Sequence, residues 1–362
     1  MRRLGSIVSG LTAASRAMQA ANANDDGRLG HLTGFGSNPG ELDARLYAAT
    51  GSPTALVVVL HGCTQAASTY DRGSGWSQLA ERHGFALLFP QQRRTNNSNL
   101  CFNWFLPGDA RRGRGEAASI SQMVQHLANR YGLDRSRIFI TGLSAGGAMT
   151  SVMLACYPEL FAGGAVLAGL PFASANTLPE ALERMRGQGA PRRRELAGRA
   201  MAAADHSGRS PTLSVWHGTH DTTVDPSNAT AIVDQWRDLH GLGADAGAVE
   251  LGDGHRREAW FDGNGRVLIE RYDVHGMGHG TPLNTRDGEE CGIAGPHMLD
   301  VGICSTRRMA RSWGLLLNDP AQRELVQPAK AAQPRSQPSQ PPQPSGPGAV
   351  IEDALRAAGL MR

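Results

Sequence analysis

The stretch ITGLSAGGAM, Ile140–Met149, places Ser144 between Gly142 and Gly146, directly after the apolar run RIFI. Two interpretations fit these residues. A strand that turns tightly into a helix uses glycines for close packing, and this structural interpretation involves no chemistry. Alternatively, the strained turn lifts the serine hydroxyl above the end of a sheet as a nucleophile elbow. The remainder of the chain distinguishes between the two.

Composition sets the class of protein. The chain has 362 residues, 40% of them hydrophobic, and a formal net charge of +3. That length and composition suffice for one large α/β domain, and the small charge does not indicate a nucleic-acid partner. The basic run PRRRE at 191–195 is typical of a solvated loop. No stretch approaches the ~20 apolar residues that a membrane span needs, so the sequence predicts a soluble protein.

Apolar runs and helical patterns alternate along the chain. Helical spacing of apolar residues covers 116–132, ending at Gly132, and also 147–161. Runs with the length of buried parallel strands occupy 55–60, 85–90, 137–142, 212–218 and 267–274. This alternation predicts an α/β fold with an open, mostly parallel central sheet and helices on both faces.

Four segments follow from changes in composition. Residues 1–28 form an amphipathic or flexible segment, in which Ala21-Asn22-Ala23 resembles a cleavage site but the apolar stretch is diluted by Gly, Ser and Thr. Residues 29–318 form the compact domain, with a surface insertion at 173–211 that is helical around PEALERMRG. Residues 319–348 form an extended Pro-rich linker. Residues 349–362 form a short amphipathic C-terminal helix.

The five cysteines leave the redox compartment open. Cys156 lies in an apolar helical pattern and is expected to be a buried small side chain. The other four could form two bridges in an oxidising compartment, or remain thiols in the cytosol: Cys63, Cys101, Cys291 and Cys304. No Cys-x-x-Cys pattern indicates zinc, and no metal or organic cofactor is expected.

A nucleophilic serine needs a base and a carboxylate that orients it. In α/β-hydrolases these follow the serine in the order acid, then histidine, each after a strand. Asp221 in SVWHGTHDTTVDP and His279 in RYDVHGMGHGTPL occupy such positions. Asp225 and His275 compete with them. We favour His279 because flanking glycines let its loop reach the nucleophile, and Asp221 because of its place in the turn before Val224.

Backbone N–H groups that bind the developing oxyanion complete this chemistry. Ala145 follows the nucleophile and supplies one N–H group. The loop LHGCTQ follows an early strand, which makes the amide of Cys63 the second donor. His61 in the same loop is explained as a hydrogen-bonded structural histidine. Since these pieces agree in order and spacing, they favour the nucleophile elbow over a purely structural turn.

The chain resembles the poly(3-hydroxybutyrate) depolymerase-type esterases, in particular their type I α/β-hydrolase catalytic domain. The matching pieces include LHGCTQ, FPQQ, CFNWF, GRGEAASI, DRSRIFITGLSAGGAM, WHGTHDTTV, GMGHG and CGIAGPHMLDVGICS, in the family's order. The resemblance implies a triad of Ser144, Asp221 and His279 with oxyanion donors Cys63 and Ala145. It also implies the bridges Cys63–Cys101 and Cys291–Cys304, which need an oxidising compartment.

The resemblance implies a polyester substrate, hydrolysed through an acyl-enzyme. The indistinct signal and short tail resemble an intracellular depolymerase, so the expected location is the cytoplasm, on storage granules to which the amphipathic ends could adhere. Trp104, Phe172 and Trp216 are candidates for an apolar substrate wall, although each is equally explained as core. One alternative is a secreted feruloyl or acetylxylan-type esterase, and another is a non-catalytic granule coat protein.

Overall fold

A computed structural model describes residues 27–48, 51–204, 208–286 and 291–316 of the chain. The chain divides into two units, Met1–Leu317 and Asn318–Arg362, and only the first contains described residues. The predicted Pro-rich linker and C-terminal helix lie outside the described residues, as does almost all of the predicted N-terminal segment.

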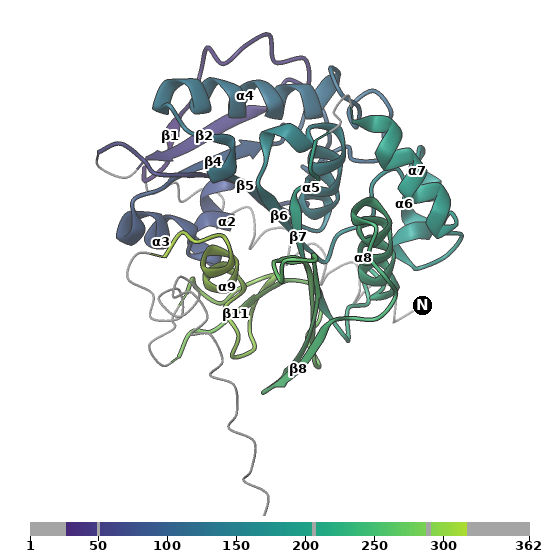
Figure 1. Ribbon diagram of the computed structural model, residues 1–362. Helices are drawn as coiled ribbons and strands as arrows, with labels where there is room; N and C mark the ends of the chain where they lie inside the picture. The colour runs from purple at the N-terminus through teal and green to yellow at the C-terminus, as the bar shows by residue number, and fades with distance from the viewer. Residues whose placement is uncertain (1–26, 49–50, 205–207, 287–290, 317–362) are drawn as a thin grey trace, which may run out of the picture. The chain divides into compact units, whose positions relative to one another are not determined.

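One large sheet organises the first unit (Figure 1). Its strand order is β1-β2-β4-β3-β5-β6-β7-β10-β9-β8. The central strands from β4 to β10 pair in parallel, whereas β1, β2, β9 and β8 pair antiparallel at the two ends. The strands are β1 (Gly30–His31), β2 (Asp43–Ala48), β3 (Leu56–Leu60), β4 (Ala86–Gln91), β5 (Ile138–Leu143), β6 (Gly163–Leu167), β7 (Thr212–Gly218), β8 (Ala248–Gly252), β9 (His255–Phe261) and β10 (Val267–Val274). A separate parallel pair joins β11 (Thr281–Leu283) to β12 (Met298–Asp300).

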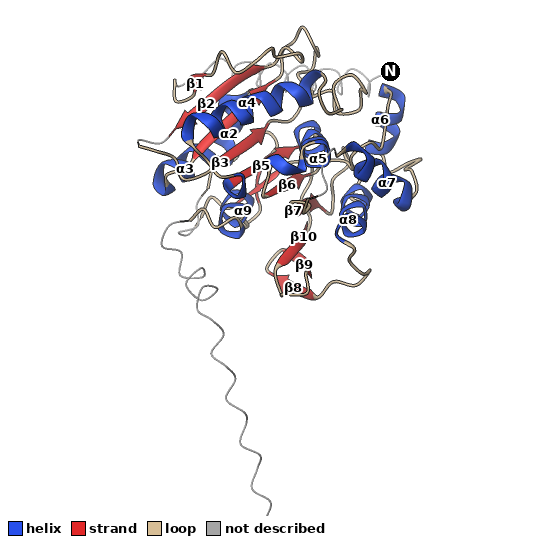
Figure 2. Ribbon diagram, turned by 45° about the horizontal axis from the view of Figure 1, so that its top comes forward, coloured by secondary structure: helices blue, strands red, loops and turns tan. Residues whose placement is uncertain are grey.

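Helices cover both faces of the sheet, as predicted (Figure 2). Successive residues of β3 point to opposite faces, so Val58 packs in one core cluster and Val59 in the other. The first cluster lies under α4 (Gly115–Tyr131), α5 (Ala145–Cys156), α6 (Leu178–Met185), α7 (Arg193–Ala203) and α8 (Ser227–His240). The second lies under α2 (Ala67–Ser74), α3 (Trp76–His83) and α9 (Ser305–Ser312).

Helix ends follow local chemistry. Gly132 ends α4 in the left-handed conformation, as predicted. The next predicted helix, at 147–161, is shorter than expected: α5 ends at Cys156, because the residue before Pro158 is disfavoured in the helical region. Pro158–Leu160 then forms a single 3-10 turn. Cys156 is buried and unbridged, which confirms its prediction.

The insertion at 173–211 contains two helices rather than one. The PEALERMRG pattern becomes α6, begun by the Thr177 side chain, which accepts a hydrogen bond from Glu180 N. The second helix, α7, contains few large apolar residues, so its sequence did not predict a helix packed on the core. Both lie beside α8 in Figure 2. In the described part of the chain, no helix is both long enough and apolar enough to cross a membrane.

Candidate active site

Ser144 stands at the turn from β5 into α5 with a left-handed backbone (φ 58°, ψ −118°). A non-glycine residue in such a region stores about 1–3 kcal/mol of strain. The turn is tight: a Cβ added at Gly142 would lie 2.4 Å from the Gly146 carbonyl oxygen. A Cβ at Gly146 would lie 2.5 Å from the carbonyl oxygens of Leu60 and His61. The two glycines of the motif therefore let α5 begin directly against the end of β3.

The backbone of Ser144 is fully used, but its hydroxyl is not. The Ser144 N–H donates to the Leu167 carbonyl at 2.9 Å, and its carbonyl accepts from Ala148 N at 2.8 Å. The residue occupies the N-cap position of α5, where a serine hydroxyl ordinarily accepts a backbone hydrogen bond. Its side chain makes no such bond. The half-buried hydroxyl is thus held at a rigid turn without being used for capping.

The loops after β7 and β10 are joined by backbone contacts. A Cβ at Gly218 would lie 2.2 Å from the Met277 carbonyl oxygen, so the two chains approach as closely as glycine allows. Thr219 N donates to the Val274 carbonyl, and His220 N donates to the Met277 carbonyl, each at 3.0 Å. Because β7 and β10 are parallel neighbours, these contacts bring together residues that lie far apart in the sequence.

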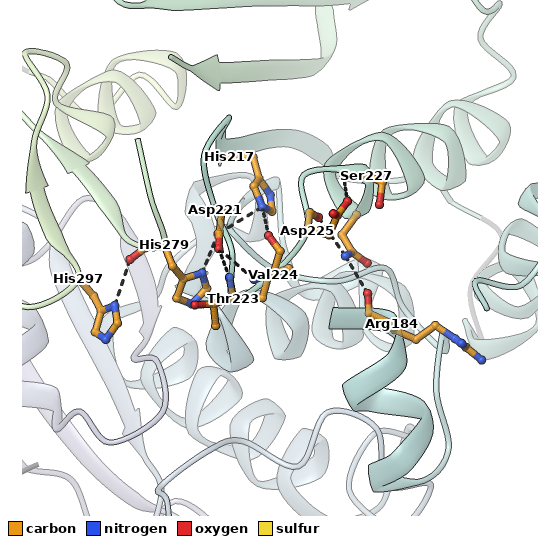
Figure 3. A network of polar contacts seen from close by, with 10 residues as sticks. Arg184, His217, Asp221, Thr223, Val224, Asp225, Ser227, His279 and His297 are labelled. Atoms are coloured by element: carbon orange, nitrogen blue, oxygen red, sulfur yellow. Dashed lines mark hydrogen bonds and ion pairs between the residues drawn. The ribbon is translucent and has the colours of Figure 1, made fainter. Parts of the chain in front are cut away.

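Asp221 and His279 meet at this junction (Figure 3). The Nδ1–H of His279 donates to Asp221 Oδ2 at 2.7 Å, and the Asp221 side chain is fully buried. Burial would raise the pKa of Asp221, but the nearby His217 and the hydrogen bonds from His279 and the Val224 amide hold it well below its usual range. The carboxylate is therefore ionised and fixes the His279 tautomer, which leaves Nε2 as a base. His297 Nδ1 donates to the His279 carbonyl at 3.0 Å and steadies the same loop.

The competing acid and histidine have other surroundings. Ser227 at the start of α8 donates hydrogen bonds to Asp225 from its hydroxyl and from its backbone N–H, which lower the pKa of Asp225 as for an ordinary carboxylate at a helix end. The His275 side chain is exposed to solvent. The preference for Asp221 and His279 thus agrees with the geometry, while their catalytic role remains a prediction.

A second histidine, His217, lies beside Asp221, and it was not among the candidate residues predicted from the sequence. Its Nε2 donates to the Val224 carbonyl at 2.8 Å and lies 3.4 Å from Asp221 Oδ2, with both side chains almost completely buried. Since a carbonyl only accepts, the proton resides on Nε2; within the described residues, Nδ1 has no partner. The sequence did contain an indication of this contact, because His217 lies near the end of β7 and four residues before Asp221.

The two predicted oxyanion donors have unengaged amides. Ala145 is the first residue of α5, so its N–H has no acceptor within the helix. In the described part of the chain, the Cys63 N–H donates to no backbone oxygen. His61 in the same loop is buried, donates from Nδ1 to the Gly62 carbonyl and accepts from Gln92 N. Burial lowers the pKa of His61 to about 4, which supports its interpretation as a neutral structural histidine.

Disulfides join Cys63 to Cys101 and Cys291 to Cys304, the pairs that the family resemblance implies. The first bridge ties the Cys63 loop to the loop after β4. A buried carboxyl group holds that second loop: Glu116 accepts from Gln92 Nε2 at 2.5 Å and from Asn103 N at 2.9 Å. Burial raises the pKa of Glu116 to about 8. Both Gln92 and Glu116 lie in quoted motifs, FPQQ and GRGEAASI, without having been singled out.

The three aromatic candidates separate into two environments. Trp104 and Phe172 are largely buried but line a cavity of about 570 Å³. Trp216 does not belong to a substrate wall, which corrects its prediction. It points into the core from β7, is 1% exposed, stacks on Tyr272 with ring centroids 3.7 Å apart, and donates its indole N–H to Ser214. Because β7 is buried on both faces, its sequence pattern does not distinguish a core residue from a residue of a substrate wall.

Several known proteins are similar to this chain in sequence and in fold. Residues 45–259, more than half of the chain, match the family model described as esterase PHB depolymerase. The chain is 41% identical over 293 residues to poly(3-hydroxyalkanoate) depolymerase C of Paucimonas lemoignei, covering 80% of this chain and 70% of that protein. The chain belongs to the esterase PHB depolymerase family.

Acetylxylan esterases are also similar to this esterase. Acetylxylan esterase A of Aspergillus oryzae is 35% identical over 232 residues, which cover 61% of this chain and 74% of that protein. The solved structure of an acetyl xylan esterase from Aspergillus awamori superposes with a TM-score of 0.67 at 25% identity, covering 80% of this chain and 99% of that one. The family establishes the protein as an α/β-hydrolase that cleaves carboxylic esters.

The contact between His217 and Asp221 predicts a change in the pH profile of the esterase. In His217→Leu the Asp221 carboxylate loses the polar Nε2–H group that lies 3.4 Å from its Oδ2, so it attracts the His279 proton more strongly. The pKa that governs the acid limb of kcat/KM should therefore move to higher pH, and kcat should fall about tenfold, as expected for one hydrogen bond to a charged group.

Initial rates on a soluble ester from pH 5 to 9 measure both effects. His217→Gln, which keeps an N–H donor, should restore most of the rate, and His275→Leu at the exposed histidine is the matched control. A lower rate with an unmoved acid limb would show that His217 acts by packing alone.

The buried Glu116 predicts a pH-dependent stability. Its folded pKa of about 8 exceeds the ordinary value of 4.5, so the folded protein retains a proton that the unfolded chain releases. The free energy of unfolding should fall as pH rises through this window. Glu116→Gln removes that dependence and should gain more than about 1 kcal/mol over the wild type between pH 5 and pH 8.

Urea unfolding at the two pH values tests this difference. Glu41→Gln, at an exposed carboxylate, should follow the wild type. If Glu116→Gln also followed the wild type, the Glu116 carboxyl would not retain its proton in the fold.

Proposed function

We propose that this protein is a serine esterase that hydrolyses poly(3-hydroxybutyrate) and its oligomers through an acyl-enzyme, with Ser144, His279 and Asp221 as its triad. The observation that carries the proposal is the buried hydrogen bond between His279 Nδ1 and Asp221 Oδ2. It occurs at the sheet edge where β5 turns into α5 at Ser144. A metal-free acyl transfer needs a nucleophile, a base and an orienting carboxylate, and these residues supply all three.

The proposed reaction has two stages. Ser144 Oγ attacks the ester carbonyl carbon while His279 Nε2 takes its proton, and the oxyanion is bound by the amides of Cys63 and Ala145. The C–O bond then breaks, and the alcohol end leaves with the proton from His279. In the second stage water gives a proton to His279 and attacks the acyl carbon, which releases the acid and returns the proton to Ser144. Asp221 stabilises the imidazolium in both stages.

The polyester is the proposed substrate class because the relative with 41% identity is a poly(3-hydroxyalkanoate) depolymerase. The ester-rich, methyl-bearing chain would suit a surface with exposed apolar side chains, such as Leu178 and Leu182 on α6. A cell-wall ester of the acetylxylan or feruloyl type is the second candidate, which the similarity to acetylxylan esterases favours.

The site of action is proposed separately from the chemistry. The family resemblance favours the cytoplasm and storage granules, with secretion as the alternative. Disulfides persist in oxidising compartments and are rare in the cytosol. The pairs Cys63–Cys101 and Cys291–Cys304 therefore support the alternative, and we propose that the enzyme works in an oxidising compartment.

Acid release from amorphous poly(3-hydroxybutyrate) granules tests the substrate, with acetylated xylan and methyl ferulate run beside it. The wild type should release acid from granules fastest, and Ser144→Ala should lose at least about 1000-fold because the nucleophile is removed. Ser136→Ala, at an exposed serine, should keep full activity. Activity confined to xylan or ferulate esters would replace the polyester proposal, and an active Ser144→Ala would overturn the triad.

Thiol counting tests the location. Protein isolated from its own cells, unfolded without reductant and treated with iodoacetamide, should take up one label, at Cys156, because the other four cysteines are bridged. The same protein with reductant added should take up five. Five labels without reductant would contradict the proposed oxidising compartment and favour the cytoplasm.

A further inference from the structure

A cavity of about 570 Å³ lies between the loop after β4, the loop after β6 and the insertion. Its walls combine aromatic and cationic side chains. Trp104 and Phe172 contribute aromatic rings, and several alanines contribute methyl groups. Three arginines also line it, Arg111, Arg112 and Arg199. This combination suits a ligand with an apolar body and an anionic end.

The cavity extends away from the nucleophile. Its lining includes Cys156, the last residue of α5, whereas Ser144 precedes the first residue of that helix. Twelve helical residues span roughly 18 Å. The Cys156 side of the cavity therefore lies about one helix length from the reacting serine. A group bound there belongs to a part of the ligand other than the ester under attack.

Two of the three arginines are already engaged. Arg112 pairs with Glu159 through both terminal nitrogens and donates to the Cys156 carbonyl at 2.7 Å. Arg199 donates to the Ala173 carbonyl and to Glu195 at 2.5 Å. These contacts hold their guanidinium planes in the cavity wall and make them structural.

Arg111 differs from its neighbours. Arg111 is exposed to solvent, and within the described residues its side chain makes no hydrogen bond or ion pair. No described Asp or Glu lines the cavity to balance its charge. The Cys156 thiol does not balance it either: burial raises the pKa of Cys156 to about 12, although the charges of Arg112 and Arg111 act in the opposite direction. The exposed Arg111 guanidinium therefore has no anionic partner among the residues that line the cavity and is free to pair with an anion from solution.

We propose that this cavity binds an organic monocarboxylate, with Arg111 pairing with the carboxylate and Trp104 and Phe172 packing against its apolar body. A guanidinium group is matched to a carboxylate in both charge and geometry. The identity of the natural ligand rests on the proposed function: it is the free-acid end of a 3-hydroxybutyrate oligomer, which every cleavage of the polyester creates.

Calorimetric titration of the Ser144→Ala protein measures this binding without hydrolysis. The 3-hydroxybutyrate trimer as free acid should bind about tenfold more tightly than its methyl ester, the effect of one charge-assisted hydrogen bond. Arg111→Gln in the same background should remove that difference. Arg194→Gln, at an exposed arginine on α7 outside the cavity lining, should keep it.

The outcomes separate this site from the proposed function. Equal affinity for acid and ester, or an Arg111→Gln protein that still distinguishes them, overturns the site. Tighter binding of ferulic acid than of the trimer supports the carboxylate site and overturns its assignment to the polyester. Because binding is measured in a variant without the nucleophile, an inactive wild type on granules would contradict the proposed function and leave the titration interpretable.

Discussion

The site depends on backbone segments that approach one another more closely than any side chain permits. At Gly146 the start of α5 lies against the end of β3, and at Gly218 the end of β7 lies against the loop that carries His279. Each contact joins two of the loops on which the chemistry is placed. An added methyl group at either position would meet a carbonyl oxygen at 2.5 Å or less, so the loops would have to separate.

Beside these contacts, the buried Asp221 carboxylate is held by several hydrogen-bond donors at once. Asp221 receives hydrogen bonds from His279 and from the Thr223 and Val224 amides, with His217 near the same oxygen as His279. A buried carboxylate without these donors would be costly to ionise. His279 is itself one of these donors, so the hydrogen bond that helps to keep Asp221 charged also orients the His279 ring.

The loops after β3 and β4 are stabilised by different means. The Cys63–Cys101 disulfide crosslinks them, and the Glu116 carboxyl group holds the second loop through Gln92 and Asn103. The amide predicted to bind the oxyanion and the aromatic wall at Trp104 are thereby connected by covalent and hydrogen-bonded structure. Because burial raises the pKa of Glu116, its carboxyl group retains a proton in the folded protein, and the loop after β4 is most stable when Glu116 is neutral.

Much of this protein was predictable from local sequence. Glycines around Ser144 predicted a strained turn, and apolar runs predicted the parallel strands. Positions in loops after strands predicted that Asp221 and His279 are the acid and the histidine of the site. Each of these predictions depends on residues that are close in the chain. Tertiary structure decided the remainder. His217 contacts Asp221, Trp216 stacks in the core, and Arg111 lines a cavity because of how β7, β10 and the insertion pack. Trp216 and Arg111 meet segments that are far apart in the sequence, which a local pattern does not identify. His217 lies only four residues from Asp221, but the strand pattern does not indicate that its side chain turns toward that carboxylate.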